Sequence, residues 1–129
     1  MNELHLALPF PPSTNTYWRH TVYKGKPRTL ISERGRKYRS TVKRLCLIKR
    51  AGWQLSQRLR VNVQLDAPDK RTRDIDNYNK ALLDALVHAG VMRDDSLIDE
   101  LNIVRGPIGK PGQVLVTIGV MNDANNNKI

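Results

Sequence analysis

Strict alternation of apolar and polar residues is the feature that most constrains the fold of this chain. Leu59, Val61, Val63 and Leu65 occupy every second position of one segment. Successive side chains of a β-strand point to opposite faces, so this pattern predicts a strand with one buried face. Apolar alternation marks the segments 3–9, 59–65, 101–103 and 114–120. A sheet built from these strands must bury its apolar face against another layer.

Two segments carry apolar residues at the spacing of an α-helix, which supplies that second layer. The first helix is expected from about Glu33 to Arg50, with Ser32 as its N-cap. The second is expected from Asp76, as N-cap or first turn, to a stop at Gly90. The apolar positions are Tyr38, Val42, Leu45 and Cys46 in the first segment and Leu82, Leu83, Leu86 and Val87 in the second.

The remaining segments indicate connections. The prolines of residues 9–15 stop regular structure, a hairpin is expected over Thr21–Ile31 around Lys24-Gly25-Lys26, and Asp94-Asp95-Ser96 reads as a turn. The predicted fold class is therefore α+β. It has two layers, a mixed sheet of about four strands with two helices on one face. We expect one domain over residues 1–121 and a disordered, Asn-rich tail over 122–129.

Composition excludes several classes of protein. The chain has 129 residues and one cysteine, which rules out an internal disulfide and any zinc site with several cysteines. No apolar stretch approaches the ~18 residues of a membrane span, and the N-terminal segment lacks the basic region of a secretory signal. We therefore expect no membrane association and a cytoplasmic location.

Charge is unevenly distributed along the chain. The net charge is +10, which favours polyanionic partners. Trp18–Arg60 holds fourteen Lys or Arg and one acid, whereas Asp66–Glu100 holds nine acids and five bases. A protein that only coats nucleic acid needs the basic part alone. A nuclease needs both, because basic groups bind phosphate and carboxylates bind the metal ion.

Three aspartates are candidate metal ligands. Asp74 and Asp76 are two residues apart, so in an extended entry to a helix both carboxylates point the same way and can share a cation. Asp95 follows the second helix, and its return to Asp74 depends on tertiary folding. An alternative explains the same residues equally well, with Asp76 as a helix cap and Asp94-Asp95 as a turn.

Lys80 lies four residues from both Asp76 and Asp84. The spacing alone favours exposed ion pairs along a helix, worth ~0.2–0.5 kcal/mol each. The alternative is an ammonium beside the metal site, where it stabilises charge on the reacting phosphate.

The run from Arg73 to Asp95 resembles the core of the RusA family of Holliday junction endonucleases. It reads Arg73-Asp74-Ile-Asp76-Asn77-x-x-Lys80-Ala-x-x-Asp84-Ala-Leu-x-x-Ala89-Gly90-x-x-x-Asp94-Asp95. The opening Leu8-Pro9-x-Pro11-Pro12-Ser13-x-Asn15-x-Tyr17-x-Arg19-His20 is also similar, and the likeness spans roughly residues 4–120. One departure is Thr72, which interrupts a stretch that is more uniformly arginine in the best-known member.

The resemblance implies roles for the candidate residues. Asp74, Asp76 and Asp95 match the catalytic, metal-binding aspartates, and Lys80 matches an essential catalytic lysine. Mg²⁺ is the implied ion, with Mn²⁺ as a substitute, because carboxylates bind Mg²⁺ while it keeps several waters. No small-molecule cofactor is expected.

The basic residues are expected to contact DNA. A solvated helix face explains dense charge as well, but the near-absence of acids favours a phosphate-binding surface. Tyr17 and Trp18 more often belong to a core than to a base-stacking surface. The candidate contacts are Arg19, Lys24, Lys26, Arg28, Arg34, Arg36, Lys37, Arg39, Lys43, Arg44, Lys70, Arg71 and Arg73.

The sequence thus predicts a homodimeric, Mg²⁺-dependent endonuclease that resolves four-way DNA junctions by paired cuts, in recombination and repair in a bacterial host. Two alternatives remain at this point. One is an architectural protein that binds branched DNA without cutting it. The other is a metal-dependent nuclease that acts on other branched DNA.

Overall fold

Alternation in the sequence is matched by a mixed four-stranded sheet in the computed structural model, which describes residues 3–121. Its strands are β1 (Glu3–Leu8), β4 (Leu59–Asp66), β5 (Ile98–Arg105) and β6 (Gln113–Val120), in the order β1-β6-β4-β5. β4 pairs in parallel with β5 and antiparallel with β6. Every second residue of β4 from Leu59 to Leu65 is buried, as the alternation predicts.

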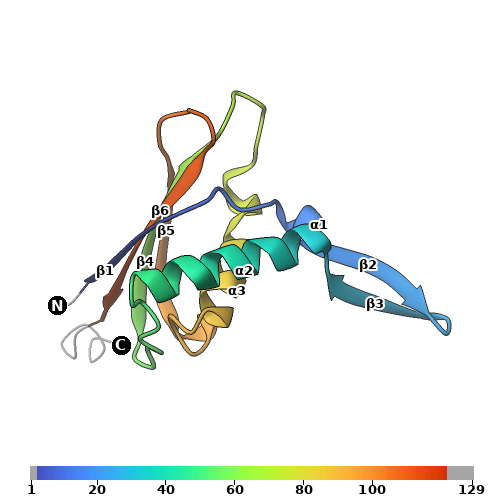
Figure 1. The fold of residues 1–129 in the computed structure, drawn as a ribbon, viewed down its shortest axis with the longest axis horizontal. Coiled ribbons are helices and arrows are strands. Elements are labelled where there is room, and N and C mark those ends of the chain that lie inside the picture. Colours follow the sequence, from blue (N-terminus) through green and yellow to red (C-terminus); the bar gives the residue numbers. More distant parts are fainter. Residues whose placement is uncertain (1–2, 122–129) are drawn as a thin grey trace.

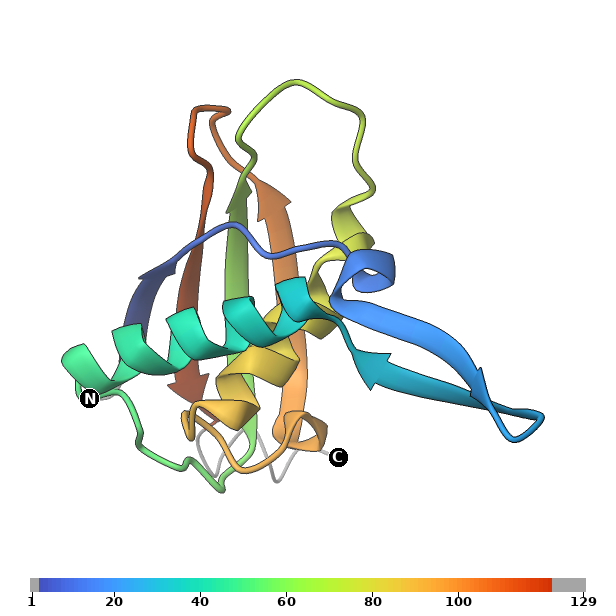
Figure 2. The same cartoon turned by 45° about the vertical axis from the view of Figure 1, so that its right-hand side comes forward.

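Two long helices, α2 (Glu33–Ile48) and α3 (Asn79–His88), lie across one face of this sheet (Figures 1 and 2). Their apolar stripes join the apolar faces of the strands in one hydrophobic cluster. Leu82 and Leu86 are fully buried there, and so is Cys46. The predicted α+β class, with helices on one face of a mixed sheet, is confirmed. Among residues 3–121, no helix is long and apolar enough to cross a membrane.

Ser32 caps α2 as expected and also connects it to a short helix, α1 (Thr14–Tyr17). The Ser32 hydroxyl accepts a hydrogen bond from the Gly35 N–H at 3.0 Å and donates toward the Thr16 carbonyl at 2.6 Å. The sequence did not predict α1. It forms because the Ser13 carbonyl accepts from the Tyr17 N–H at 2.8 Å as the chain leaves the prolines.

The predicted hairpin is confirmed and begins three residues earlier than expected. β2 (Trp18–Tyr23) and β3 (Lys26–Ile31) form a separate two-stranded sheet that extends away from the body of the molecule (Figure 2).

The second helix begins later than predicted. Asp76 lies in a 3₁₀ turn, η1 (Ile75–Asn77), and α3 starts only at Asn79. The Asn77 N–H donates to the Asp74 carbonyl at 3.1 Å, and Tyr78 then departs from helical geometry with φ of −123°. The Tyr78 ring is buried, with its centroid 5.0 Å from that of Phe10. This packing interrupts the helix, so the prediction of Asp76 as an α-helix cap was wrong.

The turn expected at Asp94–Ser96 is a second 3₁₀ turn, η2 (Asp95–Leu97). The Asp94 carboxylate caps it by accepting from the Ser96 N–H at 3.1 Å. The disordered tail predicted for residues 122–129 lies outside the described part of the chain.

Candidate functional site

Asp74, Asp76 and Lys80 lie together at the N-terminal end of α3. β4 ends at Asp66, and the following loop leads to η1, which carries Asp76 and is preceded by Asp74. Lys80 is in the first turn of α3. All three side chains belong to exposed residues. The 3₁₀ turn and the helix start therefore present two carboxylates and one ammonium to solvent.

The three predicted metal ligands differ from the other carboxylates in having no partner. Within residues 3–121, the side chains of Asp74, Asp76 and Asp95 form no hydrogen bond or ion pair. Every other described Asp or Glu has one. Carboxylates without protein partners are available to a hard cation such as Mg²⁺, which prefers oxygen ligands.

Asp95 is not brought to Asp74 and Asp76 within one chain. It opens η2, which lies near the C-terminal end of α3, whereas η1 precedes its N-terminal end (Figure 2). The ten residues of α3 span about 15 Å. Accordingly, no group of three His, Cys, Asp or Glu side chains in the described structure is arranged to hold one metal ion.

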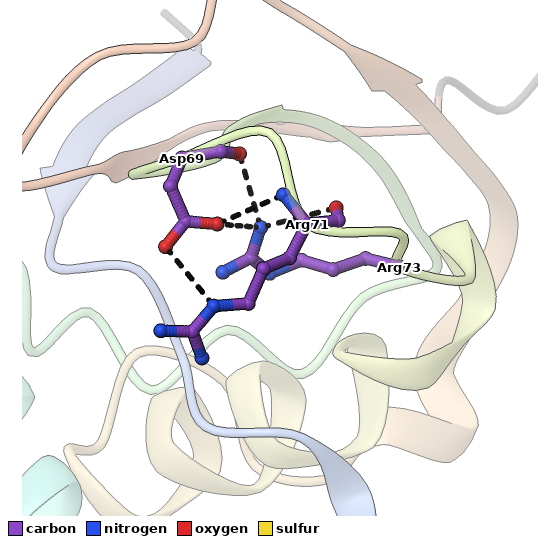
Figure 3. A network of polar contacts seen from close by, with 3 residues as sticks. All are labelled: Asp69, Arg71 and Arg73. Atoms are coloured by element: carbon purple, nitrogen blue, oxygen red, sulfur yellow. Dashed lines mark hydrogen bonds and ion pairs between the residues drawn. The ribbon is translucent and has the colours of Figure 1, made fainter.

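The loop before Asp74 is organised by Asp69. Its Oδ1 accepts from the Arg71 N–H at 3.0 Å and from Arg73 Nη1 at 2.9 Å (Figure 3). The Arg73 guanidinium, over the Phe10 ring at 5.6 Å, also donates to the Asp69 carbonyl at 3.1 Å. These hydrogen bonds, that from Arg73 above all, hold the pKa of Asp69 below its ordinary value. Asp69 is therefore ionised at neutral pH and keeps the loop folded back on itself.

Two hollows are lined by residues of this loop. One, of about 460 Å³, is lined by Asp69 and Asp74 together with four cations, which are Lys70, Arg71, Arg73 and Arg105. The other, of about 650 Å³, shares Arg71 and Arg73 and adds Arg34 and Lys37 from α2. The loop thus presents positive charge to both hollows, and in one of them next to Asp74, a carboxylate without a partner in the described structure, as binding of a phosphodiester beside a metal ion requires.

Ion pairs of Lys80 with Asp76 or Asp84, which spacing alone favoured, do not form in the described structure. Asp84 instead accepts hydrogen bonds from Tyr17 Oη and from Arg39 Nε, the latter at 2.9 Å. Burial and the hydrogen bond to Asp84 raise the pKa of Tyr17. Asp84 therefore connects α3 to α1 and α2 through Tyr17 and Arg39. The Lys80 ammonium has no ion-pair partner in the described structure and is available to a phosphate.

The predicted DNA contacts divide into two groups. Most are exposed: Arg19, Lys24, Lys26 and Arg28 on the hairpin, Arg34, Arg36, Lys37, Lys43 and Arg44 on α2, and Lys70 and Arg71 on the loop. Arg39 and Arg73 are only 26% and 18% exposed in their side chains. Each is bound to an aspartate of its own chain, so a direct contact of Arg39 with DNA does not fit the structure.

The sequence pattern did not single out Asp69 or Arg105 as site residues. Arg105 Nη2 donates to the Arg73 carbonyl at 2.6 Å, next to Asp74. The alternation of Asp69, Arg71 and Arg73 could have indicated that Asp69 contacts the arginines, since alternate side chains of an extended loop lie on one side. Nothing local marks Arg105, which reaches the loop only through the pairing of β5 with β4.

Comparison with known proteins gives a consistent family assignment. A family model described as Endodeoxyribonuclease RusA matches residues 9–119. The crossover junction endodeoxyribonuclease rusA of Enterobacteria phage HK97 is 43% identical over 106 residues, covering 82% of this chain and 85% of the relative. The enzyme of the same name from Enterobacteria phage 82 is 37% identical over 121 residues, covering 94% and 98%. That of Escherichia coli K12 is 36% identical with the same coverage.

Proposed function

Because this chain belongs to the RusA family of endodeoxyribonucleases, we propose that it resolves four-way DNA junctions by Mg²⁺-dependent phosphodiester hydrolysis. The observation that carries the proposal is that Asp74, a carboxylate without a partner in the described structure, lines a hollow together with four cations, with Asp76 two residues further on in η1. We further propose that it acts in recombination and repair, in the cytoplasm of a bacterial host.

Each group has a chemical role in this proposal. Asp74, Asp76 and Asp95 hold Mg²⁺, for which Mn²⁺ substitutes. When bound, the ion supplies activation of the attacking water and positive charge toward the phosphate. Lys70, Arg71 and Arg105 orient the strand by contacting its phosphates, and Asp69 keeps Arg71 and Arg73 in place. Lys80 stabilises the negative charge that develops on the scissile phosphate or the leaving oxygen.

We propose that two copies of the chain share each metal site. Asp95 lies across the length of α3 from Asp74 and Asp76, so one copy does not assemble all three ligands. A two-fold dimer places Asp95 of each copy against the Asp74–Asp76 pair of the other, which gives two identical sites. Two sites related by a two-fold axis suit a junction that must be nicked in two strands.

Mixed dimers test this arrangement. Asp74→Asn and Asp95→Asn are each expected to abolish cleavage of an end-labelled four-way junction while leaving binding intact. If the site is shared, a dimer with one copy of each variant keeps one complete site and regains single nicks. The matched control is a mixed dimer with one Asp74→Asn copy and one Asp76→Asn copy. It has no complete site and should stay inactive. If neither mixed dimer regains cleavage while Asp74→Asn and Asp95→Asn are each inactive alone, all three ligands belong to one copy.

The same assay separates the alternative functions. A linear duplex of matched sequence is incubated beside the junction, with Mg²⁺, Ca²⁺ or EDTA. We expect cleavage of the junction alone, and binding but not cleavage in Ca²⁺, which takes more ligands in looser geometry. Binding without cleavage in Mg²⁺ would indicate an architectural protein. Equal cutting of both substrates would indicate a general nuclease.

A further inference from the structure

The β2–β3 hairpin is an extended arm. Its two strands form their own sheet and are joined to the body at Trp18 and Ile31, which pack against the core. Each strand has six residues, or about 20 Å at ~3.4 Å per residue. Figures 1 and 2 show the hairpin projecting beyond the start of α2, away from the four-stranded sheet.

The turn of the hairpin favours a regular ribbon. Lys24 and Gly25 both have positive φ, 51° and 76°. Positive φ at both central residues is the pattern of a type I′ turn, whose twist matches that of the paired strands. The register continues without a bulge from Trp18↔Ile31 to Tyr23↔Lys26. The ribbon therefore keeps its two faces distinct along its length.

Charge is confined to one of these faces. Strand pairing places Arg19, Thr21 and Tyr23 on the same face as their partners Leu30, Arg28 and Lys26. The opposite face carries His20, Val22, Pro27 and Thr29 and has no Lys or Arg. Residues 18–31 contain no acid. The arm is thus a ribbon with a cationic face, defined by Arg19, Lys26 and Arg28, and an uncharged face.

Tyr23 lies among the cations near the tip of the arm. The Arg28 guanidinium is 5.1 Å from the ring centroid, and Lys24 Nζ is 5.4 Å from it. Tyr23 is 53% exposed. The ring holds both cations close together without neutralising them, so their charge remains available to an anion.

We propose that the cationic face of the hairpin binds the phosphate backbone of a duplex arm of the junction, away from the cleavage point. The proposal rests on the proposed function and names the part of the substrate that the hairpin recognises. The ribbon length of about 20 Å corresponds to about six base pairs at ~3.4 Å each. A two-stranded ribbon also fits the major groove of B-DNA. A second copy of this chain is the less suitable occupant, because its own net charge is +10.

Charge-matched variants test the role of the β2–β3 hairpin in binding. Lys26→Gln/Arg28→Gln removes two charges from the cationic face. Lys49→Gln/Arg50→Gln removes two exposed charges elsewhere, at the other end of α2. Junction binding is measured without Mg²⁺. Each lost phosphate contact should reduce the salt slope by ~0.9 and affinity roughly tenfold near 0.1 M salt. We expect this loss for the hairpin variant and a smaller change for the control.

The length of the DNA arms tests whether the hairpin binds a duplex arm of the junction. Junction arms are shortened from about 20 to about five base pairs, fewer than the six that the ribbon would cover. A hairpin excision, with residues 20–29 replaced by Asn-Gly so that Arg19 and Leu30 still pair, serves as the second variant. Shortening should weaken binding by the native chain and leave the excised variant unaffected.

Two outcomes would overturn the proposal. One is equal sensitivity of both proteins to arm length, especially if Tyr23→Ala alone weakens binding, since the hairpin would then act at the branch point. The other is conversion of a dimer to a monomer by the excision in light scattering, which would make the hairpin a subunit contact. Junction cleavage is measured separately in Mg²⁺. Its absence in the native chain would contradict the proposed function without affecting the binding result.

Discussion

Adjacent aspartates in this chain have different environments. The Asp94 carboxylate caps η2, whereas Asp95 beside it has no partner among residues 3–121. Asp69 binds two arginines of its loop, whereas Asp74 binds no side chain of the described structure. Hydrogen bonding therefore separates carboxylates that stabilise the fold from those available to a cation.

Lys80→Ala tests the catalytic role of the ammonium. Lys80 is exposed at the start of α3 without an ion-pair partner in the described structure, so its loss should cost little stability. A cation beside the reacting phosphate matters most where charge develops, so turnover should fall by ~100-fold or more while junction affinity changes severalfold. Single-turnover cleavage and binding in Ca²⁺ measure the two effects. A loss confined to affinity would make Lys80 a plain phosphate contact.

Tyr17 and Tyr38 should make stability depend on alkaline pH. Burial raises the pKa of both phenols, and the Tyr38 hydroxyl also donates to the Pro9 carbonyl at 2.8 Å. A raised pKa in the folded state means that the stabilisation is complete below about pH 10, the unfolded value, and is lost as pH rises above it. Each phenol then contributes a loss of about 1.4 kcal/mol per pH unit.

Urea denaturation between about pH 8 and pH 11 measures this slope. These limits lie about two units below and about one unit above the ordinary phenol pKa. Tyr17→Phe should be less stable at neutral pH, because Asp84 and Arg39 lose a partner, but its stability should fall less steeply above pH 10. Tyr17→Phe/Tyr38→Phe should fall less steeply still. An unchanged slope in the double variant would assign the alkaline loss to other groups.

Gly35 allows a close contact between α2 and the elements that precede it. Gly35 lies in the first turn of α2, where a Cβ would come within 2.5 Å of the Tyr17 carbonyl oxygen and 2.7 Å of Ile31 Cγ1. That carbonyl accepts the Ser32 N–H at 2.9 Å, so it is held in place. The absence of a side chain at Gly35 therefore allows α1, the base of the hairpin and α2 to meet.

Gly35→Ala should destabilise the protein by roughly 1–3 kcal/mol, the range for overpacking. Alanine improves helix propensity by up to ~1 kcal/mol, which offsets only part of this clash. The control is Gly52→Ala, where a Cβ meets nothing within 4 Å. Thermal denaturation compares the two. Equal melting temperatures would show that the contact with the Tyr17 carbonyl relaxes easily.

At the scale of the whole molecule, the positions of the candidate ligands favour a dimer as the working unit. The stripe of Leu82, Leu83 and Leu86 on α3 is buried within its own chain, so core packing accounts for it. Asp95 instead favours the proposed two copies, because one chain keeps it away from Asp74 and Asp76.

A supercoiled plasmid that extrudes a cruciform tests the dimer. Two sites within one bound complex should cut both strands before dissociation and give linear DNA directly. Light scattering should give twice 14.7 kDa. Persistent nicked circles together with a monomeric mass would contradict the dimer and indicate an enzyme that nicks single strands.

The sequence by itself determined the strands, the two long helices and their buried faces, because side-chain alternation and helical spacing are local properties. It also singled out Asp74, Asp76 and Asp95, the described carboxylates that prove to lack partners. Only the tertiary structure decided the rest. Arg39 meets Asp84 across forty-five residues, and Arg105 meets Arg73 across thirty-two. Such pairings, and the separation of Asp95 from Asp74, depend on how helices pack on the sheet, which no local pattern encodes.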